Sequence, residues 1–294
     1  MHDPPCAIEA AQQTLAAGYL IVSAITVWIW DLSLSVSEDV RTFWGRKFRP
    51  YDLIYLLARM TTGGLLMSPI GFLTAHSRTR CQHVSMTVIW FETLSLIFNS
   101  SLFLLRVIAV YGDSSRKLKA GFIFVWSTTF LAISGPLSVQ TDVAFIDCDI
   151  NKMKAPLPPG FEAVTIFDTL VFVAISVKVL KINSIWHFPG KSWVMSFICG
   201  DGLNHLSKVL LRSGQIYYLT TVGFNVFTLI TLLSPNSTFF SVPFKTGSIF
   251  VSLALQNVMT CKVFRLLRLG GIQNDLSMGQ FASIEFASNE LEME

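Results

Sequence analysis

The stretch Leu15–Ser35, LAAGYLIVSAITVWIWDLSLS, contains a single charged residue, Asp31. A hydrocarbon core of about 30 Å needs roughly 20 mostly apolar residues in one helix. The stretch has that length and that composition, so it predicts a membrane-spanning helix. No basic segment precedes it, and Asp3 and Glu9 lie in the residues before it. We therefore expect the stretch to stay in the protein as an anchor, because a cleaved signal peptide would begin with basic residues.

Six further stretches of similar length and hydropathy follow along the chain. They are Tyr51–Thr74, Val84–Tyr111, Leu118–Val139, Phe161–Lys181, Gln215–Ser234 and Phe244–Arg265. Backbone exposed to lipid must satisfy its own hydrogen bonds, so helix is expected in every one. The sequence predicts an all-α polytopic membrane protein, a seven-transmembrane-helix bundle over 15–268. A short outer segment, 1–14, precedes the bundle, and an acidic tail, 269–294, follows it and is expected to be disordered.

The composition agrees with a membrane protein. Charged residues make up 14% of the 294 residues, apolar residues make up 52%, and the mean hydropathy is +0.54. Soluble domains carry about 25% charged residues, so a water-soluble monomer is excluded. The net charge of +3 is too small and too scattered for a nucleic-acid-binding protein. The lipid bilayer is therefore the expected partner, and the residence is a plasma membrane or an endomembrane.

Basic residues near the ends of the predicted helices indicate the orientation of the chain. The connections after the first, third and fifth helices, and the segment after the seventh, hold most of them: Arg41, Arg46, Lys47, Arg49, Arg116, Lys117, Lys119, Lys181, Lys191, Lys208, Arg212, Lys262, Arg265 and Arg268. The other connections hold Arg78, Arg80, Lys152, Lys154 and Lys245. Cytosolic segments are enriched in Lys and Arg, so the N terminus is predicted outside and the C terminus in the cytosol.

In this orientation two cysteines and one glycosylation sequence lie on the outer side. Cys81 and Cys148 are predicted to form a disulfide, with two free thiols as the alternative and Cys6 as a possible competitor. Asn236 begins the sequence Asn-Ser-Thr and is a glycosylation candidate. Asn99 fits the same pattern but lies in the middle of a predicted span, where glycosylation is not expected.

Ionisable residues within predicted spans are the candidate functional residues, because a charge in hydrocarbon is costly and usually faces the inside of the bundle. Arg59 and Glu92 each lie about 12 Å from the nearest end of their span, on adjacent helices. We expect them to form a buried pair. Asp168 lies at the level of Glu92, and three amides lie near mid-membrane: Asn225, Gln256 and Asn257. These six residues could line one polar pocket that opens outward. Alternatively, they form interhelical hydrogen bonds that hold the bundle together.

A second ion pair is expected near the inner ends of the first and third helices, where Asp31 could accept from Arg106 or from cations of the connecting loops. An Arg106 side chain that reaches the interface along its own helix is the alternative.

Motifs of enzymes and cofactor sites are not found. No histidine lies within a predicted span, which argues against an intramembrane metal site. No glycine pattern for a nucleotide and no Ser–His pairing at membrane depth is present, so no catalytic residue, cofactor or metal is predicted. The protein is not expected to be an enzyme.

Several motifs occur in order along the chain. The first two spans and the connection between them contain Trp30–Ser35, then Glu38-Asp39-Val40-Arg41, then Tyr55-Leu56-Leu57-Ala58-Arg59. Leu105-Arg106-Val107 and Ala109–Gly112 end the third span, and Leu210–Gly214 with Tyr217-Tyr218 begins the sixth. Together they resemble a fungal family of seven-helix membrane proteins defined by an N-terminal domain of unknown function, here about Tyr19–Thr62. The family has no established activity, so the resemblance implies an architecture and no mechanism.

Two functions fit these features. The first is a receptor-like signalling protein whose inner loops, including the long connection Lys181–Gly214, contact a cytosolic partner. The second is a transporter or proton-coupled carrier that uses Arg59, Glu92 and Asp168. The sequence does not identify a ligand for either function.

Overall fold

A computed structural model of the chain describes residues 4–43, 49–74, 78–111, 116–134, 159–184, 205–234 and 241–291. Within them, side chains are described at 12–40, 49–71, 83–109, 111, 116–133, 160–178, 219–234 and 241–266. The helices are α1 (Pro4–Phe43), α2 (Pro50–Thr74), α3 (Arg78–Tyr111), α4 (Arg116–Ser134), α6 (Pro159–Ser184), α8 (His205–Leu233) and α9 (Val242–Leu291). Every regular element in these ranges is an α-helix, as the predicted all-α class requires.

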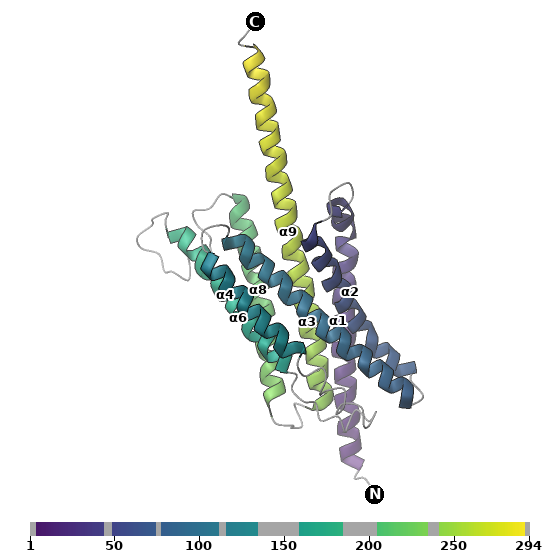
Figure 1. Ribbon diagram of the computed structural model, residues 1–294. Helices are drawn as coiled ribbons and strands as arrows, with labels where there is room; N and C mark the ends of the chain where they lie inside the picture. The colour runs from purple at the N-terminus through teal and green to yellow at the C-terminus, as the bar shows by residue number, and fades with distance from the viewer. Residues whose placement is uncertain are drawn as a thin grey trace.

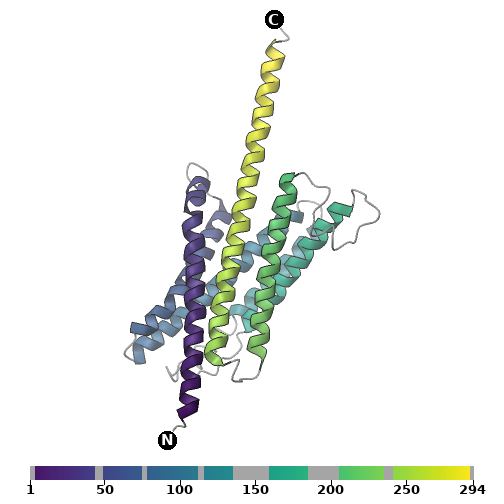
Figure 2. The same ribbon diagram turned by 180° about the vertical axis from the view of Figure 1, so that it is seen from behind.

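Successive helices run up and down through one bundle, so the start of α1 and the end of α9 lie at opposite ends of it (Figure 1). Helix α9 packs between α1 and α8, which lie on either side of it in Figure 2. Helix α2 packs against α3, and α6 packs against both α3 and α4. Helix α9 also contacts α2 and α3, so it packs against four other helices, as α3 does with α2, α4, α6 and α9.

Five helices are long and apolar enough to cross a membrane, which indicates an integral membrane protein. Their apolar segments are Gln12–Val40, Pro50–Gly71, His83–Ala109, Gly160–Lys178 and Val242–Leu266. In α8 the apolar segment with described side chains is the shorter Leu219–Leu233. Helix α4 ends at Ser134, and the remainder of its predicted span, 135–139, lies outside the described residues. Seven crossings and an outer N terminus therefore stay predictions.

The helices extend past the predicted spans at both ends of the chain. Helix α1 begins at Pro4, so it includes most of the segment 1–14, for which no secondary structure was predicted. The segment 269–294, which was predicted to be a disordered tail, continues α9 as a helix to Leu291 and projects beyond the other helices (Figure 1). The segment contains no proline, and it is rich in residues that favour helices, such as Ala, Glu, Gln, Leu and Met.

Helix α2 contains a proline in its interior without ending there. Pro69 has no N–H group to donate to the carbonyl of Leu65, one turn earlier. The Ser68 hydroxyl donates to that carbonyl instead, at 2.6 Å. The freed carbonyl is thus satisfied inside the helix, which is what a helix in hydrocarbon requires.

Two adjacent glycines in α2 allow the neighbouring helices to approach closely. A Cβ atom added at Gly63 would lie 2.6 Å from the Trp28 ring of α1, and one added at Gly64 would lie 2.5 Å from the Phe91 ring of α3. Trp28 and Phe91 also pack against the main apolar cluster, which includes Leu65, Leu66, Leu96 and Leu253. The glycine pair therefore sets the spacing of α1, α2 and α3.

We predict that Gly64→Ala lowers the melting temperature of the purified protein, whereas Gly121→Ala does not. A Cβ at Gly121 would meet no atom within 4 Å. Both substitutions add the same atom to a helix and gain similar helix propensity, so their difference isolates the collision with Phe91. We expect Gly64→Ala to melt at least about 3 °C below Gly121→Ala, followed by tryptophan fluorescence. Equal melting temperatures would contradict the packing described for α2 and α3.

Candidate functional site: buried polar clusters around α9

Arg59 of α2 is buried and bridges two carboxylates of α1. Its Nη2 atom lies 2.6 Å from Asp31 Oδ2, and its Nη1 atom lies 2.5 Å from Asp39 Oδ2. Nη1 also donates to the Tyr55 hydroxyl at 3.0 Å. The planar guanidinium presents several donors in a fixed fork, which suits one cation shared by two acids.

A second arginine, Arg265 of α9, enters the same group of residues. Its Nη2 atom donates to Asp31 Oδ1 at 3.0 Å, and its Nη1 atom donates to the Tyr55 hydroxyl at 3.1 Å. Its Nε atom lies 3.4 Å from Glu38 Oε2. The Asp31 carboxylate therefore joins the two guanidiniums, one through each oxygen. We call this set the charged cluster: Asp31, Glu38, Asp39, Tyr55, Arg59 and Arg265.

Tyr55 is the uncharged centre of the charged cluster and is fully buried. Its hydroxyl accepts from both arginines and donates to Asp39 Oδ1 at 2.7 Å. Its ring stacks on Phe264 of α9, with the ring centroids 4.9 Å apart. One side chain of α2 therefore contacts α1 by a hydrogen bond and α9 by both a hydrogen bond and a ring.

Helix periodicity explains why these residues converge. Asp31 and Glu38 are seven residues apart, and Tyr55 and Arg59 are four apart, so each pair lies on one face of its helix. Three acids and two arginines leave the charged cluster with one formal negative charge in excess. Glu38 is the most exposed of the three acids, with 52% of its side chain accessible. The excess charge is therefore placed where solvent or lipid headgroups reach it.

A second, uncharged cluster joins α1, α2, α3 and α9. The Asn257 amide of α9 donates to the Ala58 carbonyl at 3.0 Å and to Asn99 Oδ1 at 2.9 Å, and its oxygen accepts from the Trp28 indole at 3.2 Å. Asn99 in turn donates to Thr62 and Ser95, whose hydroxyls lie 2.7 Å apart. Each amide contacts at least two other side chains or carbonyls, so hydrogen bonds of this cluster hold the four helices together.

A third cluster surrounds Asp168 of α6. Its Oδ2 atom accepts from Gln256 of α9 at 2.5 Å and from Asn225 of α8 at 3.2 Å. The Asn225 oxygen accepts from the Ser252 hydroxyl at 2.5 Å. We call Asp168, Asn225, Ser252 and Gln256 the Asp168 cluster.

The residues predicted to line one pocket are thus distributed over three clusters. Arg59 belongs to the charged cluster, Asn257 to the uncharged cluster, and the other two amides join Asp168 as expected. The predicted Arg59–Glu92 pair is corrected: Arg59 pairs with Asp31 and Asp39. The Glu92 Oε1 atom is buried and has no hydrogen-bond partner among the described residues. Equal depth suggested the pair, but depth does not say which way a side chain points around its helix.

The predicted Asp31–Arg106 pair is also corrected. Asp31 pairs with Arg59 and Arg265, whereas the Arg106 guanidinium donates to the Thr260 carbonyl of α9 and lies over the Phe103 ring. Arg106 is buried and Asp31 is partly buried, and each finds its partner on α9 or α2 rather than in the other. The sequence shows that a charge needs a partner, and the packing of helices decides which one it finds.

Two other predictions depend on side chains that the structure does not describe. The side chains of Cys81 and Cys148, and Asn236 with its loop, are not among the described residues, so the disulfide and the glycosylation site stay predictions. Among the cysteines with a described side chain, Cys261 is a buried free thiol. Asn99, which fits the glycosylation pattern, is fully buried.

The structure adds site residues that the sequence analysis did not single out. Glu38, Asp39, Tyr55 and Arg265 complete the charged cluster, and Asn99 joins the uncharged one. The spacing of Glu38 from Asp31 was a usable signal, because it places both acids on one face of α1. Arg265 was counted only as an orientation signal, since it lies at the boundary of the predicted span.

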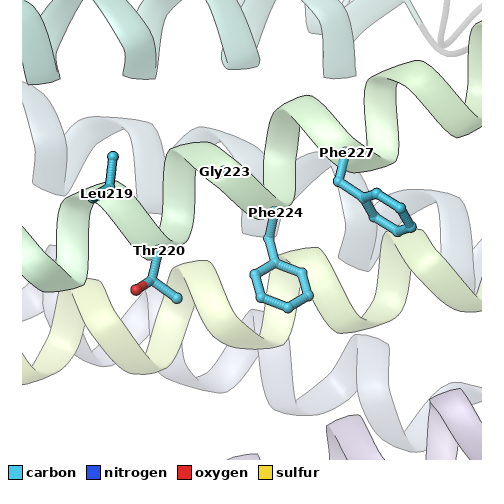
Figure 3. Close-up of a pocket in the computed structure, with 5 residues that line it drawn as sticks. All are labelled: Leu219, Thr220, Gly223, Phe224 and Phe227. Carbon is cyan, nitrogen blue, oxygen red and sulfur yellow. The ribbon is translucent and has the colours of Figure 1, made fainter.

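A shallow groove runs along the outer face of α8 and is separate from the three clusters. Figure 3 shows its lining, which comes from one helix: Leu219, Thr220, Gly223, Phe224 and Phe227. Asn225 and Thr228 of the same helix are buried on the inner side. The groove is lined by none of the residues predicted to form a polar pocket, and its apolar surface suits hydrocarbon rather than a polar solute.

We predict that Arg59→Gln destabilises the protein by about 3–5 kcal/mol, because it removes the described cation of Asp39 and one of the two cations of Asp31, and both carboxylates are largely shielded from solvent. Arg59→Lys should fall between wild type and Arg59→Gln, since an ammonium restores the charge but not the fork. Arg116→Gln, a change at an exposed arginine of α4, is the matched control and should be neutral. Chemical unfolding in detergent micelles measures all three variants. Equal stability of Arg59→Gln and Arg116→Gln would contradict the ion pairs described here.

Comparison with known proteins gives one match. Residues 19–62 match the sequence model of a family described as a family of unknown function (DUF6533). No curated protein and no solved structure matches the chain. The matched segment covers most of α1 and the first half of α2, and it contains every member of the charged cluster except Arg265. The N-terminal domain of unknown function predicted from the sequence is therefore present, and in space it is a helical hairpin that receives an arginine from α9.

Proposed function

We propose that this protein is a receptor-like signalling protein with seven membrane crossings, an outer N terminus and a cytosolic C terminus. In this proposal it belongs to the seven-helix family that its motifs resemble. The charged cluster acts as a latch, by which we mean that the contacts of Arg265 hold α9 against the α1–α2 hairpin and can open. Ligand binding elsewhere in the bundle opens the latch and moves the part of α9 that projects into the cytosol.

The observation that carries the proposal is the position of Arg265. The apolar segment of α9 ends at Leu266, so Arg265 lies where the helix leaves the bundle. At that point it contacts Asp31, Glu38 and Tyr55, which belong to the two other helices of the cluster. Charged pairs at a helix interface can exchange partners between two discrete arrangements, and such exchanges are a common basis of switching.

The charge count supports the same proposal. Arg59 pairs with both Asp31 and Asp39, so these two acids keep a cation when Arg265 moves away with α9. The third acid, Glu38, is 52% exposed and can be solvated instead. Opening the latch therefore leaves none of the three acids without a cation or solvent, and it costs less than breaking an isolated buried pair.

We predict that Arg265→Gln speeds guanine-nucleotide exchange on a purified heterotrimeric G protein at least about threefold over wild type, equivalent to roughly 0.7 kcal/mol in the latch equilibrium. The protein is the full chain in lipid nanodiscs, without added ligand. Lys262→Gln, which removes the same charge from an exposed residue one turn earlier on α9, is the control and should match wild type. Arg265→Lys provides a second test if Arg265→Gln does not fold. If neither the wild-type protein nor any variant changes the rate of nucleotide exchange, the result contradicts a receptor of this kind.

A carrier is the second candidate, and Asp168 favours it. A buried carboxylate on a membrane helix is a typical proton-carrying group in transporters. We predict that, if the protein is a carrier, liposomes containing it alone dissipate an imposed pH gradient and that Asp168→Asn abolishes the flux. An internal pH-sensitive dye measures the flux, and Glu162→Gln, near the start of the same helix, is the control. A gradient that persists in wild-type liposomes would contradict the carrier.

A further inference from the structure

The Asp168 carboxylate is held by only one of its two oxygens. Asp168 is 1% exposed, and both described donors to it, Gln256 and Asn225, approach Oδ2. The Oδ1 atom is buried and has no hydrogen-bond partner among the residues that the structure describes. An unsatisfied oxygen on a buried carboxylate is costly, so this position is suited to a neutralising ligand.

The residues around Asp168 are neutral polar groups from two helices, α8 and α9. Gln256, Asn225 and Ser252 are each at most 2% exposed, so the site is closed to bulk solvent in this arrangement. A carboxamide that turns by 180° exchanges its donor nitrogen for an acceptor oxygen in the same place. Both amides can therefore present oxygen to a ligand that the carboxylate attracts, and the Ser252 hydroxyl adds a further oxygen.

The surrounding charge limits the ligand to one positive charge. Arg106 of α3 acts electrostatically on Asp168, and its guanidinium is bonded to the Thr260 carbonyl. The acid of α3, Glu92, has a buried Oε1 atom without a hydrogen-bond partner among the described residues. Towards Asp168, α8 and α9 present neutral amides and hydroxyls, and the basic residues of α4 lie in its first turn, at Arg116, Lys117 and Lys119. Glu162 and Lys178 of α6 itself lie near its two ends. One carboxylate next to an arginine does not provide enough negative charge for a divalent ion.

We propose that Asp168 is the centre of a monovalent-cation site in the membrane bundle. The site takes up either a proton on Oδ1 or a sodium ion held by the carboxylate with the Gln256, Asn225 and Ser252 oxygens. Because the ligands come from α6, α8 and α9, the occupied site ties these three helices together. This inference does not depend on the signalling proposal, and it assigns a ligand class to a cluster that the charged latch does not involve.

The test measures thermal unfolding of the purified full chain in detergent by tryptophan fluorescence. One series raises NaCl from 0 to 300 mM at pH 8, with choline chloride keeping the ionic strength constant. The other series lowers the pH from 8 to 5 without sodium. Sodium binding should raise the wild-type melting temperature by about 3–5 °C, as expected when the ion is at roughly tenfold its Kd.

Asp168→Asn is nearly isosteric and should remove the response, while Glu162→Gln should keep it. A sodium response in wild type that is lost in both Asp168→Asn and Gln256→Met identifies the ligand as sodium. The ligand is a proton if sodium has no effect and the melting temperature of the wild-type protein approaches that of Asp168→Asn as the pH falls. Protonation of Asp168 removes the same negative charge that the substitution removes. If wild type and Asp168→Asn respond identically in both series, the proposal is overturned. If Asp168→Asn does not fold, Asp168→Ser takes its place in both series, because it also removes the carboxylate, and the same outcomes decide the sodium and the proton case.

Discussion

A polar side chain inside an apolar bundle must find its partner on another helix, and α9 supplies such partners along its whole passage. Its buried polar stripe begins at Lys245, which donates to the Ser234 carbonyl at the end of α8, and ends at Arg265 in the charged cluster. Between them, Gln256 contacts α6 and Asn257 contacts α1, α2 and α3. Turning or sliding α9 by one residue would break all of these contacts together. The stripe therefore fixes both the depth and the rotation of the helix.

The charged cluster gives a physical meaning to the segment that matches a family of unknown function. Within 19–62, α1 contributes three acids and α2 contributes Tyr55 and Arg59. The hairpin is therefore an acidic binding surface for Arg265, and Arg59 already neutralises part of its charge. Arg265 completes it from a helix more than 200 residues away in sequence. A short segment can thus define a structural unit although the unit closes only when the last helix packs. We therefore regard the hairpin and Arg265 as one functional element.

The candidate site was predictable from the sequence to the extent that it depends on the cost of burying charge. Arg59, Asp168 and Gln256 stand out because a polar group in an apolar stretch needs a partner wherever that partner comes from. Their pairing was predicted only partly. Arg59 and Glu92 lie at equal depths, yet Arg59 turns toward α1, where Asp31 and Asp39 supply two acids instead of one. Periodicity along one helix gives relative directions within that helix, and it says nothing of which other helix lies opposite.

The helical class, the membrane environment and the set of residues that need polar partners can be predicted from residue patterns, because hydrocarbon thickness and the cost of buried charge act on any chain regardless of its fold. The packing of the helices was needed to show that α9 lies between α1 and α8, that Arg265 shares Asp31 with Arg59, and that Asp168 meets α8 and α9 through one oxygen. These outcomes depend on the order of helices around the bundle. That order is set by close packing of many side chains at once, such as Trp28 against Gly63, and no local pattern in the sequence encodes it.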